Sequence, residues 1–350
     1  MDAEDAGALD ADPMRCGGCG AKLPADILKR VLDRVVGEPK VDGLMVGLDA
    51  PDDAAVFAPP AGKLIVQTVD QFRAFVEDPY LFGRIAANHC LGDIYAMGAA
   101  PVSALAAIAL PFADDAKMEA DLELLLRGAL RTFEAAGVAL IGGHTAEGAE
   151  TSLGFTINGI GDEGSLLRKG GLRAGDRLIL TKPLGTGVLL AADMRGDARG
   201  AWIDAAIQTM LQSNGPAAEI ARTHGATAAT DVTGFGLAGH LAEMAVSAGA
   251  SVRLRLAALP ILPGGEDAFA LGAASSLQEG NIRSVRGSLS GDTLPSILFD
   301  PQTAGGLLLG VPADRSEACL ADLQAAGYGA AAEIGEVAGP ADADRTIELV

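Results

Sequence analysis

Five aspartates of this 350-residue chain are candidates for holding a metal ion: Asp52, Asp53, Asp70, Asp93 and Asp231. Mg2+ prefers carboxylate oxygens, with water and phosphate completing its octahedral shell. Each aspartate could instead cap a helix or a turn, as this residue type often does. Asp93 stands apart, because it lies among apolar residues of an expected helix, where a bare carboxylate is costly. If the segments that carry these residues converge, the set predicts a metal-bridged phosphate site.

A glycine-rich segment, Cys16–Lys22, offers a second kind of chemistry. Its glycines on both sides of Cys19 predict a mobile loop, and the nearby positive charge of Lys22 favours the nucleophilic thiolate. A Cys-x-x-Cys pair could also be half of a zinc site or a redox pair. Zinc would need two further ligands, however, and no second pair follows in the sequence. A flexible leader with incidental thiols remains the plain alternative.

Three glycine-rich stretches, residues 142–145, 185–187 and 234–236, are candidate phosphate loops. Successive backbone N–H groups, or a following helix N-terminus, can bind phosphate oxygens there. None matches the Walker A or dinucleotide fingerprint, so tight turns explain them equally well. We expect His144 to be structural unless ATP lies nearby, and His89 and His240 to be packing or capping residues.

The elements that must position these residues divide the chain into four parts. We expect an acidic leader at 1–15, the Gly/Cys segment with an amphipathic helix at 16–39, an N-terminal lobe at 40–165 and a C-terminal lobe at 170–350. Apolar periodicity predicts strands at 64–69, 138–141, 177–180 and 306–311, and helices at 25–36, 83–97, 122–136 and, largely, 201–224. Strands that alternate with helices indicate an α+β fold of α/β layers.

Composition excludes several classes of protein. The net charge of −20 argues against a nucleic-acid partner, which needs a basic face. No apolar run reaches the ~20 residues that span a membrane. Cys90 and Cys319 lie in helical stretches and are expected to be buried, so no disulfide framework is predicted. These features together favour a cytoplasmic protein.

Seven stretches together resemble the selenophosphate synthetases, also called selenide, water dikinases. They are Gly18–Lys22, Asp52–Val56, Phe82–Asn88, Asp93–Gly98, Gly142–His144, Thr230–Gly236 and Asp300–Gly306. The resemblance covers nearly the whole chain and implies the two-lobed fold of aminoimidazole ribonucleotide synthetases. In that fold, N-lobe strands of two subunits form a barrel across a homodimer.

The resemblance also implies a reaction, in which ATP, selenide and water give selenophosphate, AMP and orthophosphate. Selenophosphate supplies activated selenium for selenocysteine and seleno-tRNA synthesis, and a selenium-delivery protein is a conceivable partner. Mg2+ is the implied cofactor. The implied catalytic residues are Cys19 and Lys22, the metal ligands Asp53, Asp93 and Asp231, and the ATP contacts Lys22, Asp52, Asp70, Asp93, Gly143, His144 and Thr145.

One departure from the family pattern concerns the second thiol. Many relatives carry a cysteine where this chain has Ala21, and the extra thiol here is Cys16. A mechanism that needs two thiols one residue apart is therefore disfavoured, whereas a single-cysteine mechanism is not. Rival interpretations are a ring synthetase or thiamine-phosphate kinase of the same fold, which should lack this loop, and a non-catalytic selenium carrier. The acidic leader is also compatible with fusion to an oxidoreductase domain.

Overall fold

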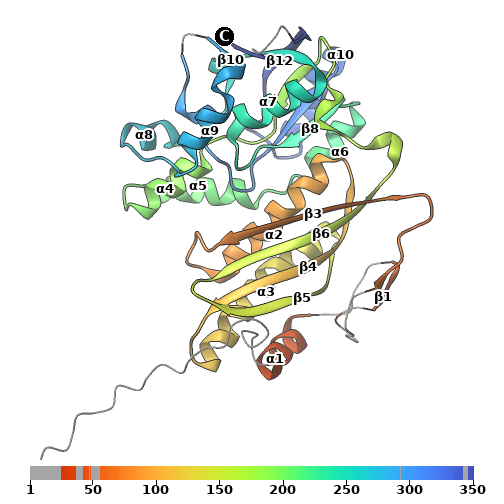
Figure 1. Cartoon of the computed structure of the whole chain (residues 1–350), viewed down its shortest axis with the longest axis vertical. Helices are drawn as coiled ribbons and strands as arrows, with labels where there is room; N and C mark the ends of the chain where they lie inside the picture. Colours follow the sequence, from red (N-terminus) through yellow and green to blue (C-terminus); the bar gives the residue numbers. More distant parts are fainter. Residues whose placement is uncertain (1–24, 37–41, 47, 49–55, 292, 342–345) are drawn as a thin grey trace, which may run out of the picture.

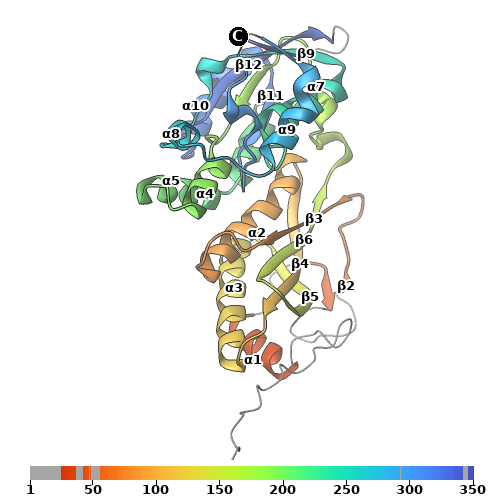
Figure 2. The same cartoon turned by 60° about the vertical axis from the view of Figure 1, so that its left-hand side comes forward.

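The computed structural model of the chain describes residues 25–36, 42–46, 48, 56–291, 293–341 and 346–350. The described residues form two lobes stacked along the long axis of the molecule (Figure 1). A helix of the N-terminal lobe, α2 (Pro79–Ala96), lies at the junction of the lobes. The turned view in Figure 2 shows the same two-lobed outline. No helix in these residue ranges is long and apolar enough to cross a membrane.

The N-lobe is built on a four-stranded sheet with the order β3-β6-β4-β5. Its strands are β3 (Leu64–Arg73), β4 (Ala100–Pro111), β5 (Ala139–Gly148) and β6 (Ser152–Gly161). β4 pairs in parallel with β5, and the other two pairings are antiparallel. α2 and α3 (Asp115–Ala136) cover one face of this sheet. Side chains of β6 alternate between the two faces, and Phe155 is fully buried in the shared core.

Local sequence signals explain where α2 begins and how closely it packs on α3. The Asp78 side chain accepts hydrogen bonds from the first turn of α2, and Pro79 occupies a position that needs no N–H donor. The helices meet closely at Gly83 and Gly128. A Cβ at Gly128 would lie 2.0 Å from the Tyr80 carbonyl oxygen, so this contact requires a residue without a side chain.

Two smaller N-lobe elements precede the sheet. α1 (Ala25–Val35) packs against α3, and its Ile27 and Val31 are fully buried. A short antiparallel pair, β1 (Leu44–Val46) and β2 (Val56–Phe57), stands apart from the main sheet.

The C-lobe contains a seven-stranded mixed sheet with the order β10-β13-β9-β12-β7-β11-β8. The strands are β7 (Arg177–Leu180), β8 (Ala228–Asp231), β9 (Ala250–Leu254), β10 (Leu289–Ser290), β11 (Leu307–Val311), β12 (Ala332–Pro340) and β13 (Ile347–Leu349). The helices are α4 (Thr186–Met194), α5 (Gly200–Leu211), α6 (Gly215–Thr223), α7 (Gly236–Ala248), α8 (Gly265–Ala270), α9 (Gln278–Val285) and α10 (Ala313–Ala325). Short 3-10 turns lie at 163–165, 169–171, 256–258, 286–288 and 296–299.

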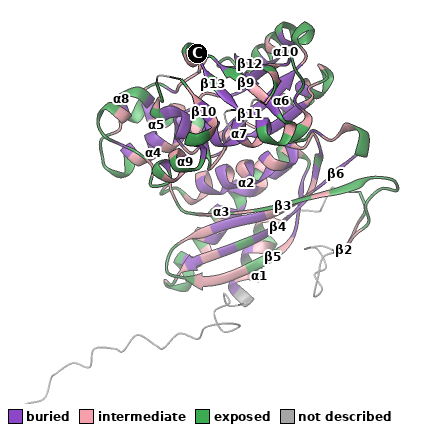
Figure 3. Cartoon of the chain, turned by 45° about the horizontal axis from the view of Figure 1, so that its top comes forward, coloured by how far each residue is buried: buried purple, intermediate pink, exposed green. Residues whose placement is uncertain are grey.

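Burial is continuous across the junction of the lobes (Figure 3). Ile85 of α2 packs in one apolar cluster with C-lobe residues of α4 and α5, including Val188 and Met210. The two lobes therefore share apolar contacts as well as polar ones. Cys90 and Cys319 are both fully buried and unpaired, as predicted.

Several expected elements differ from the structure at their ends. α2 begins four residues earlier than position 83, and α3 begins at Asp115 rather than 122. The helical stretch expected at 201–224 is two helices, because the backbone turns after α5 and restarts with Pro216 in the first turn of α6. The expected turn at 142–145 is wrong, since β5 continues through these residues beside β4.

Candidate active site

A cavity of about 1060 Å3 lies between the lobes. β3 and α2 line it from the N-lobe, and α4, the end of β8 and the loop around Gln302 line it from the C-lobe. Its volume is at the upper end of the range typical of small-molecule sites, ~300–1,000 Å3. The cavity therefore has room for a nucleotide together with a second substrate.

Three of the predicted aspartates meet in this cavity. Asp70 comes from the middle of β3, Asp93 from the last turn of α2, and Asp231 from the end of β8. Asp70 was expected at a strand end, but β3 runs on to Arg73 because it pairs with β6 over ten residues. The convergence of carboxylates from two lobes agrees with the prediction made from their residue types.

The electrostatics of this group favour a bound cation. Burial, reinforced by the neighbouring Asp93 carboxylate, raises the pKa of Asp70 to about 6. Burial and the same neighbour also raise the pKa of Asp231 above its ordinary range. Carboxylates held together out of water are costly unless a positive charge neutralises them. Within the described part of the chain, no three His, Cys, Asp or Glu side chains already have a metal-ligating arrangement.

Two local contacts hold the aspartates in place. The Thr68 hydroxyl donates a hydrogen bond of 2.5 Å to Asp93 Oδ2. Asp231 approaches α2 at Gly92, where an added Cβ would lie 2.8 Å from Oδ2. Thr68 is absent from the predicted site residues. It lies two positions before Asp70 in β3, so the two side chains are on the same face of the strand, and this spacing could have indicated Thr68.

Lys182 is a second residue that the sequence reasoning missed. Its side chain is almost fully buried, and Nζ donates to the carbonyl oxygens of Gln212 at 2.6 Å and Ala304 at 2.9 Å. Burial lowers the pKa of this ammonium to about 7, and the nearby Asp231 carboxylate opposes the change. Lys182 thus fixes two C-lobe segments behind the aspartates.

His89, predicted to be a packing or capping residue, links the two lobes. Its Nδ1 accepts a hydrogen bond of 2.9 Å from the backbone N–H of Ala304, and its ring lies 4.6 Å from that of Phe72. Burial lowers its pKa to about 4, so the imidazole is neutral with its proton on Nε2. Ala304 adopts a φ of 48°, a strained conformation for a residue with a side chain. The backbone beside the cavity is therefore held in place from both lobes.

The stretch Asp300–Gly306 has a structural explanation. Gln302 Oε1 accepts hydrogen bonds from the backbone N–H groups of Gly185 and Thr186, at the start of α4. Its Nε2 donates to the backbone and the carboxylate of Asp300. Gln302 thereby satisfies donors that a helix start leaves free. It also places Gly187 at the cavity wall.

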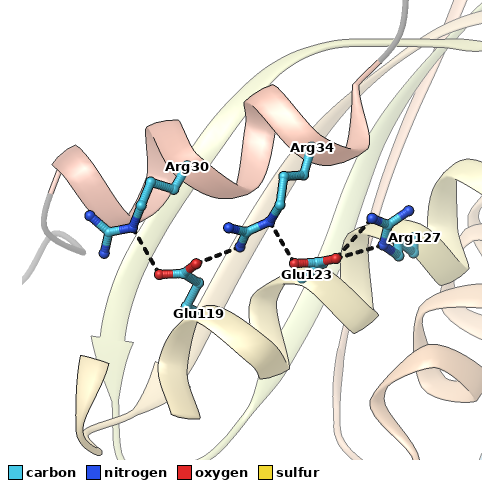
Figure 4. A network of polar contacts seen from close by, with 5 residues as sticks. All are labelled: Arg30, Arg34, Glu119, Glu123 and Arg127. Carbon is cyan, nitrogen blue, oxygen red and sulfur yellow. Dashed lines mark hydrogen bonds and ion pairs between the residues drawn. The ribbon is translucent and has the colours of Figure 1, made fainter. Parts of the chain in front are cut away.

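An ion-pair network holds α1 on α3 (Figure 4). Arg30 Nε lies 2.9 Å from Glu119, and Arg34 contacts both Glu119 at 2.6 Å and Glu123 at 2.8 Å. Arg127 completes the network at 2.8 Å from Glu123. Together with the buried side chains of α1, these pairs fix the helix that directly follows the Cys16–Lys22 segment.

Three other predicted residues lie outside the interlobe cavity. Gly143, His144 and Thr145 line a separate cavity of about 80 Å3 beside α1 and do not line the interlobe cavity. Their assignment as ATP contacts therefore stays a prediction. The Cys16, Cys19, Lys22, Asp52 and Asp53 predictions lie outside the described residues.

Two family descriptions together match most of the chain. Residues 51–161 match the AIR synthase related protein, N-terminal domain, and residues 173–347 match the corresponding C-terminal domain. Among solved structures, hydrogenase maturation protein HypE in complex with ATP is similar, with a TM-score of 0.71, 19% identity and coverage of 91% of this chain and 89% of that one. A thiamine-monophosphate kinase from Stenotrophomonas maltophilia gives a TM-score of 0.66 at 23% identity, covering 92% and 95%. These similarities show the fold.

Curated relatives are more similar in sequence. A protein of Desulfitobacterium hafniense named selenide, water dikinase is 40% identical over 331 residues, which cover 92% of this chain and 94% of that protein. One of the same name from Pelobacter propionicus is 39% identical over 329 residues, covering 91% and 92%. A third, from Clostridioides difficile, is 34% identical and covers 92% and 93%.

Proposed function

The chain belongs to the selenide, water dikinase family, and we propose from this premise how its residues carry out the family's reaction. The activity is the ATP-dependent synthesis of selenophosphate from selenide and water, with release of AMP and orthophosphate. In this family, selenophosphate supplies selenium for selenocysteine and seleno-tRNA synthesis. The observation that carries the proposal is the convergence of Asp70, Asp93 and Asp231 in one interlobe cavity.

The donor set of this cavity fits Mg2+. Carboxylate oxygens are its preferred protein ligands, and the raised pKa values of Asp70 and Asp231 indicate that a cation would stabilise their charged forms. We assign Asp93 and Asp231 as ligands, with Asp53 as the third, and Asp70 as an ATP contact. When bound, Mg2+ neutralises charge on the phosphates that are transferred. Thr68 holds the Asp93 carboxylate in its orientation.

The nucleophilic part of the reaction is assigned to Cys19 and Lys22. A thiolate beside a positive charge is suited to hold or guide a selenium nucleophile. A lysine near the phosphates would stabilise charge that develops during phosphoryl transfer. The anchoring of α1 on α3 supports this assignment, because it fixes the helix that begins three residues after Lys22.

A homodimer is proposed on the open face of the N-lobe sheet. Val69 and Ile65 of β3 are 67% and 53% exposed, although both are apolar residues of a strand. An exposed apolar sheet face is typical of an interface between subunits. A cytoplasmic location is proposed because Cys90 and Cys319 are free thiols.

The assignment of Cys19 can be tested by substitution. We expect Cys19→Ser to abolish selenide-dependent AMP formation, whereas the matched control Cys16→Ser retains it. Lys22→Met should reduce the rate, and Lys29→Met, which alters an exposed lysine of α1, should not. AMP is measured by chromatography with and without selenide. Unchanged AMP formation by Cys19→Ser would show that this thiol has no part in the reaction.

A further inference from the structure

A second cavity, of about 740 Å3, lies on the other face of α2. Asn88 and Tyr95 line it, whereas His89 and Asp93 line the candidate active site. Residues one position apart in a helix point about 100° apart and residues two positions apart about 200°, so Asn88 faces away from His89 and Tyr95 lies opposite Asp93. The second cavity is closed by α3 from the N-lobe and by α6 and residues 211–216 from the C-lobe. It is therefore a separate interlobe site.

Positively charged side chains outnumber negatively charged ones in the lining of this cavity. Four cations and two carboxylates line it: Lys63, Arg84, Arg131, Arg222, Asp162 and Glu219. Each carboxylate is already paired, Asp162 with Lys63 and Glu219 with Arg222. Within the described residues, the guanidinium groups of Arg84 and Arg131 make no ion pair or hydrogen bond. A chain with a net charge of −20 thus keeps two unpaired positive charges in one cavity.

The two arginines come from adjacent positions on packed helices. The Thr132 hydroxyl, one residue after Arg131, donates to the Arg84 carbonyl oxygen at 3.2 Å. Arg84 Nε is buried and has no hydrogen-bond partner. A buried donor without a partner is destabilising, so an acceptor brought by a ligand would relieve this cost. The pair forms one wall of the cavity.

Two further features of the cavity point to a polar ligand. Asn88 is 4% exposed, and its Nδ2 donates to the carbonyls of Met210 and Gln212, but its Oδ1 accepts no hydrogen bond from the described residues. Because Oδ1 only accepts, the ligand must bring a donor to it, such as the hydroxyl of a protonated phosphate or of a phosphomonoester. The first residue of α6, Gly215, lines the opposite side. The backbone donors of this helix start are already used, because Gly215 N–H donates to the Ser213 hydroxyl and Ala217 N–H to the Tyr328 hydroxyl, so α6 contributes only the partial positive charge of a helix N-terminus.

We propose that this cavity binds the phosphate group of a small molecule, orthophosphate or a phosphomonoester, through Arg84 and Arg131. Guanidinium groups bind phosphate oxygens with two parallel hydrogen bonds. Two unpaired guanidiniums match the double charge of a phosphate better than the single charge of a carboxylate. The volume also admits a phosphomonoester as large as a mononucleotide.

Binding at this position would connect the lobes. Arg84 and Arg131 belong to the N-lobe, and α6 belongs to the C-lobe. An anion held between them adds contacts that exist only when the lobes are in this arrangement. The ligand should therefore stabilise the protein against unfolding, by an amount that rises with the logarithm of its concentration above the dissociation constant.

Equilibrium dialysis of the full chain without Mg2+ or ATP tests the proposal, with orthophosphate and AMP as probes. We expect wild-type protein to bind at least one probe, and Arg84→Gln and Arg131→Gln each to weaken binding by about 10-fold. Arg127→Gln, on the same helix but paired with Glu123 outside the cavity, is the matched control and should bind as wild type does. Tighter binding of AMP than of orthophosphate would identify a nucleotide ligand, and equal binding a free anion.

Three results would overturn the proposal. One is a wild-type protein that binds neither probe at millimolar concentration. Another is undiminished binding by the Arg84 and Arg131 variants, which would place the anion elsewhere. The third is acetate binding as tightly as orthophosphate, which would remove the preference for the double charge of phosphate. Circular dichroism of each variant confirms folding, which is expected for Arg131→Gln because Arg131 is exposed.

Discussion

Replacing Thr68 by valine removes one hydrogen bond from the aspartate cluster and leaves side-chain shape and β-strand propensity almost unchanged. The Thr68 hydroxyl donates to Asp93 Oδ2 at 2.5 Å in a half-buried position. A hydrogen bond to a charged group contributes about 1.5–3 kcal/mol, and side chains that orient metal ligands typically change metal affinity by about 10- to 100-fold. We expect Thr68→Val to raise the half-saturating Mg2+ concentration by a factor in this range.

The assay is the rate of selenide-dependent AMP formation as a function of Mg2+ at saturating ATP. Thr209→Val is the matched control, because the Thr209 hydroxyl donates to the Ala205 carbonyl at 2.9 Å inside α5, away from the lining of the cavity. We expect the control to keep the wild-type Mg2+ dependence. An unchanged half-saturating concentration for Thr68→Val, or an equal rise for both variants, would refute the role given to Thr68.

Three other variants test separate parts of the structure. Burial raises the pKa of Asp300 from 3.8 to about 7, so the folded protein keeps this proton at pH values where the unfolded chain loses it. The wild-type protein therefore loses stability as the pH rises between these two pKa values. Asp300→Asn should therefore become more stable relative to wild type from pH 4 to 7 in thermal unfolding, and a pH-independent difference would contradict this. Glu119→Gln removes the ion pairs of Arg30 and Arg34 with Glu119 and leaves that of Arg34 with Glu123, so amide exchange of residues 25–35 should be faster at low salt than in Glu134→Gln, a change on the same helix. Equal exchange in the two variants would show that the Glu119 ion pairs do not hold α1 in place. Asn281→Leu leaves two backbone carbonyls without their donor and should cost about 2–4 kcal/mol in denaturant unfolding, whereas a loss below about 0.5 kcal/mol would contradict the bonding pattern.

The sequence allowed the aspartate cluster to be predicted, because an aspartate in an apolar helix is informative by itself. Asp93 lies in the last turn of α2, and Asp70 and Asp231 join it from the middle of β3 and the end of β8. The buried cysteines could also be predicted, since a small apolar side chain in a helical stretch is normally a core residue.

Residues whose role depends on distant backbone could not be predicted. Gly142 and Gly143 suggested a turn, but β4 approaches closely enough that a Cβ at Gly143 would lie 2.3 Å from the Ala106 carbonyl oxygen. Glycine at position 143 lets β5 pair closely with β4, and the sequence around this glycine does not indicate which strand lies beside it. Lys182 is buried because carbonyls far along the chain accept from it, which no local pattern indicates.

The central claim is that the interlobe cavity converts ATP to AMP in a reaction that consumes selenide. The most direct measurement incubates the protein with ATP and Mg2+, with and without selenide, and separates the nucleotides by chromatography. We predict AMP and orthophosphate in equal amounts only when selenide is present. ADP as the final nucleotide, or AMP formed equally without selenide, would contradict the account.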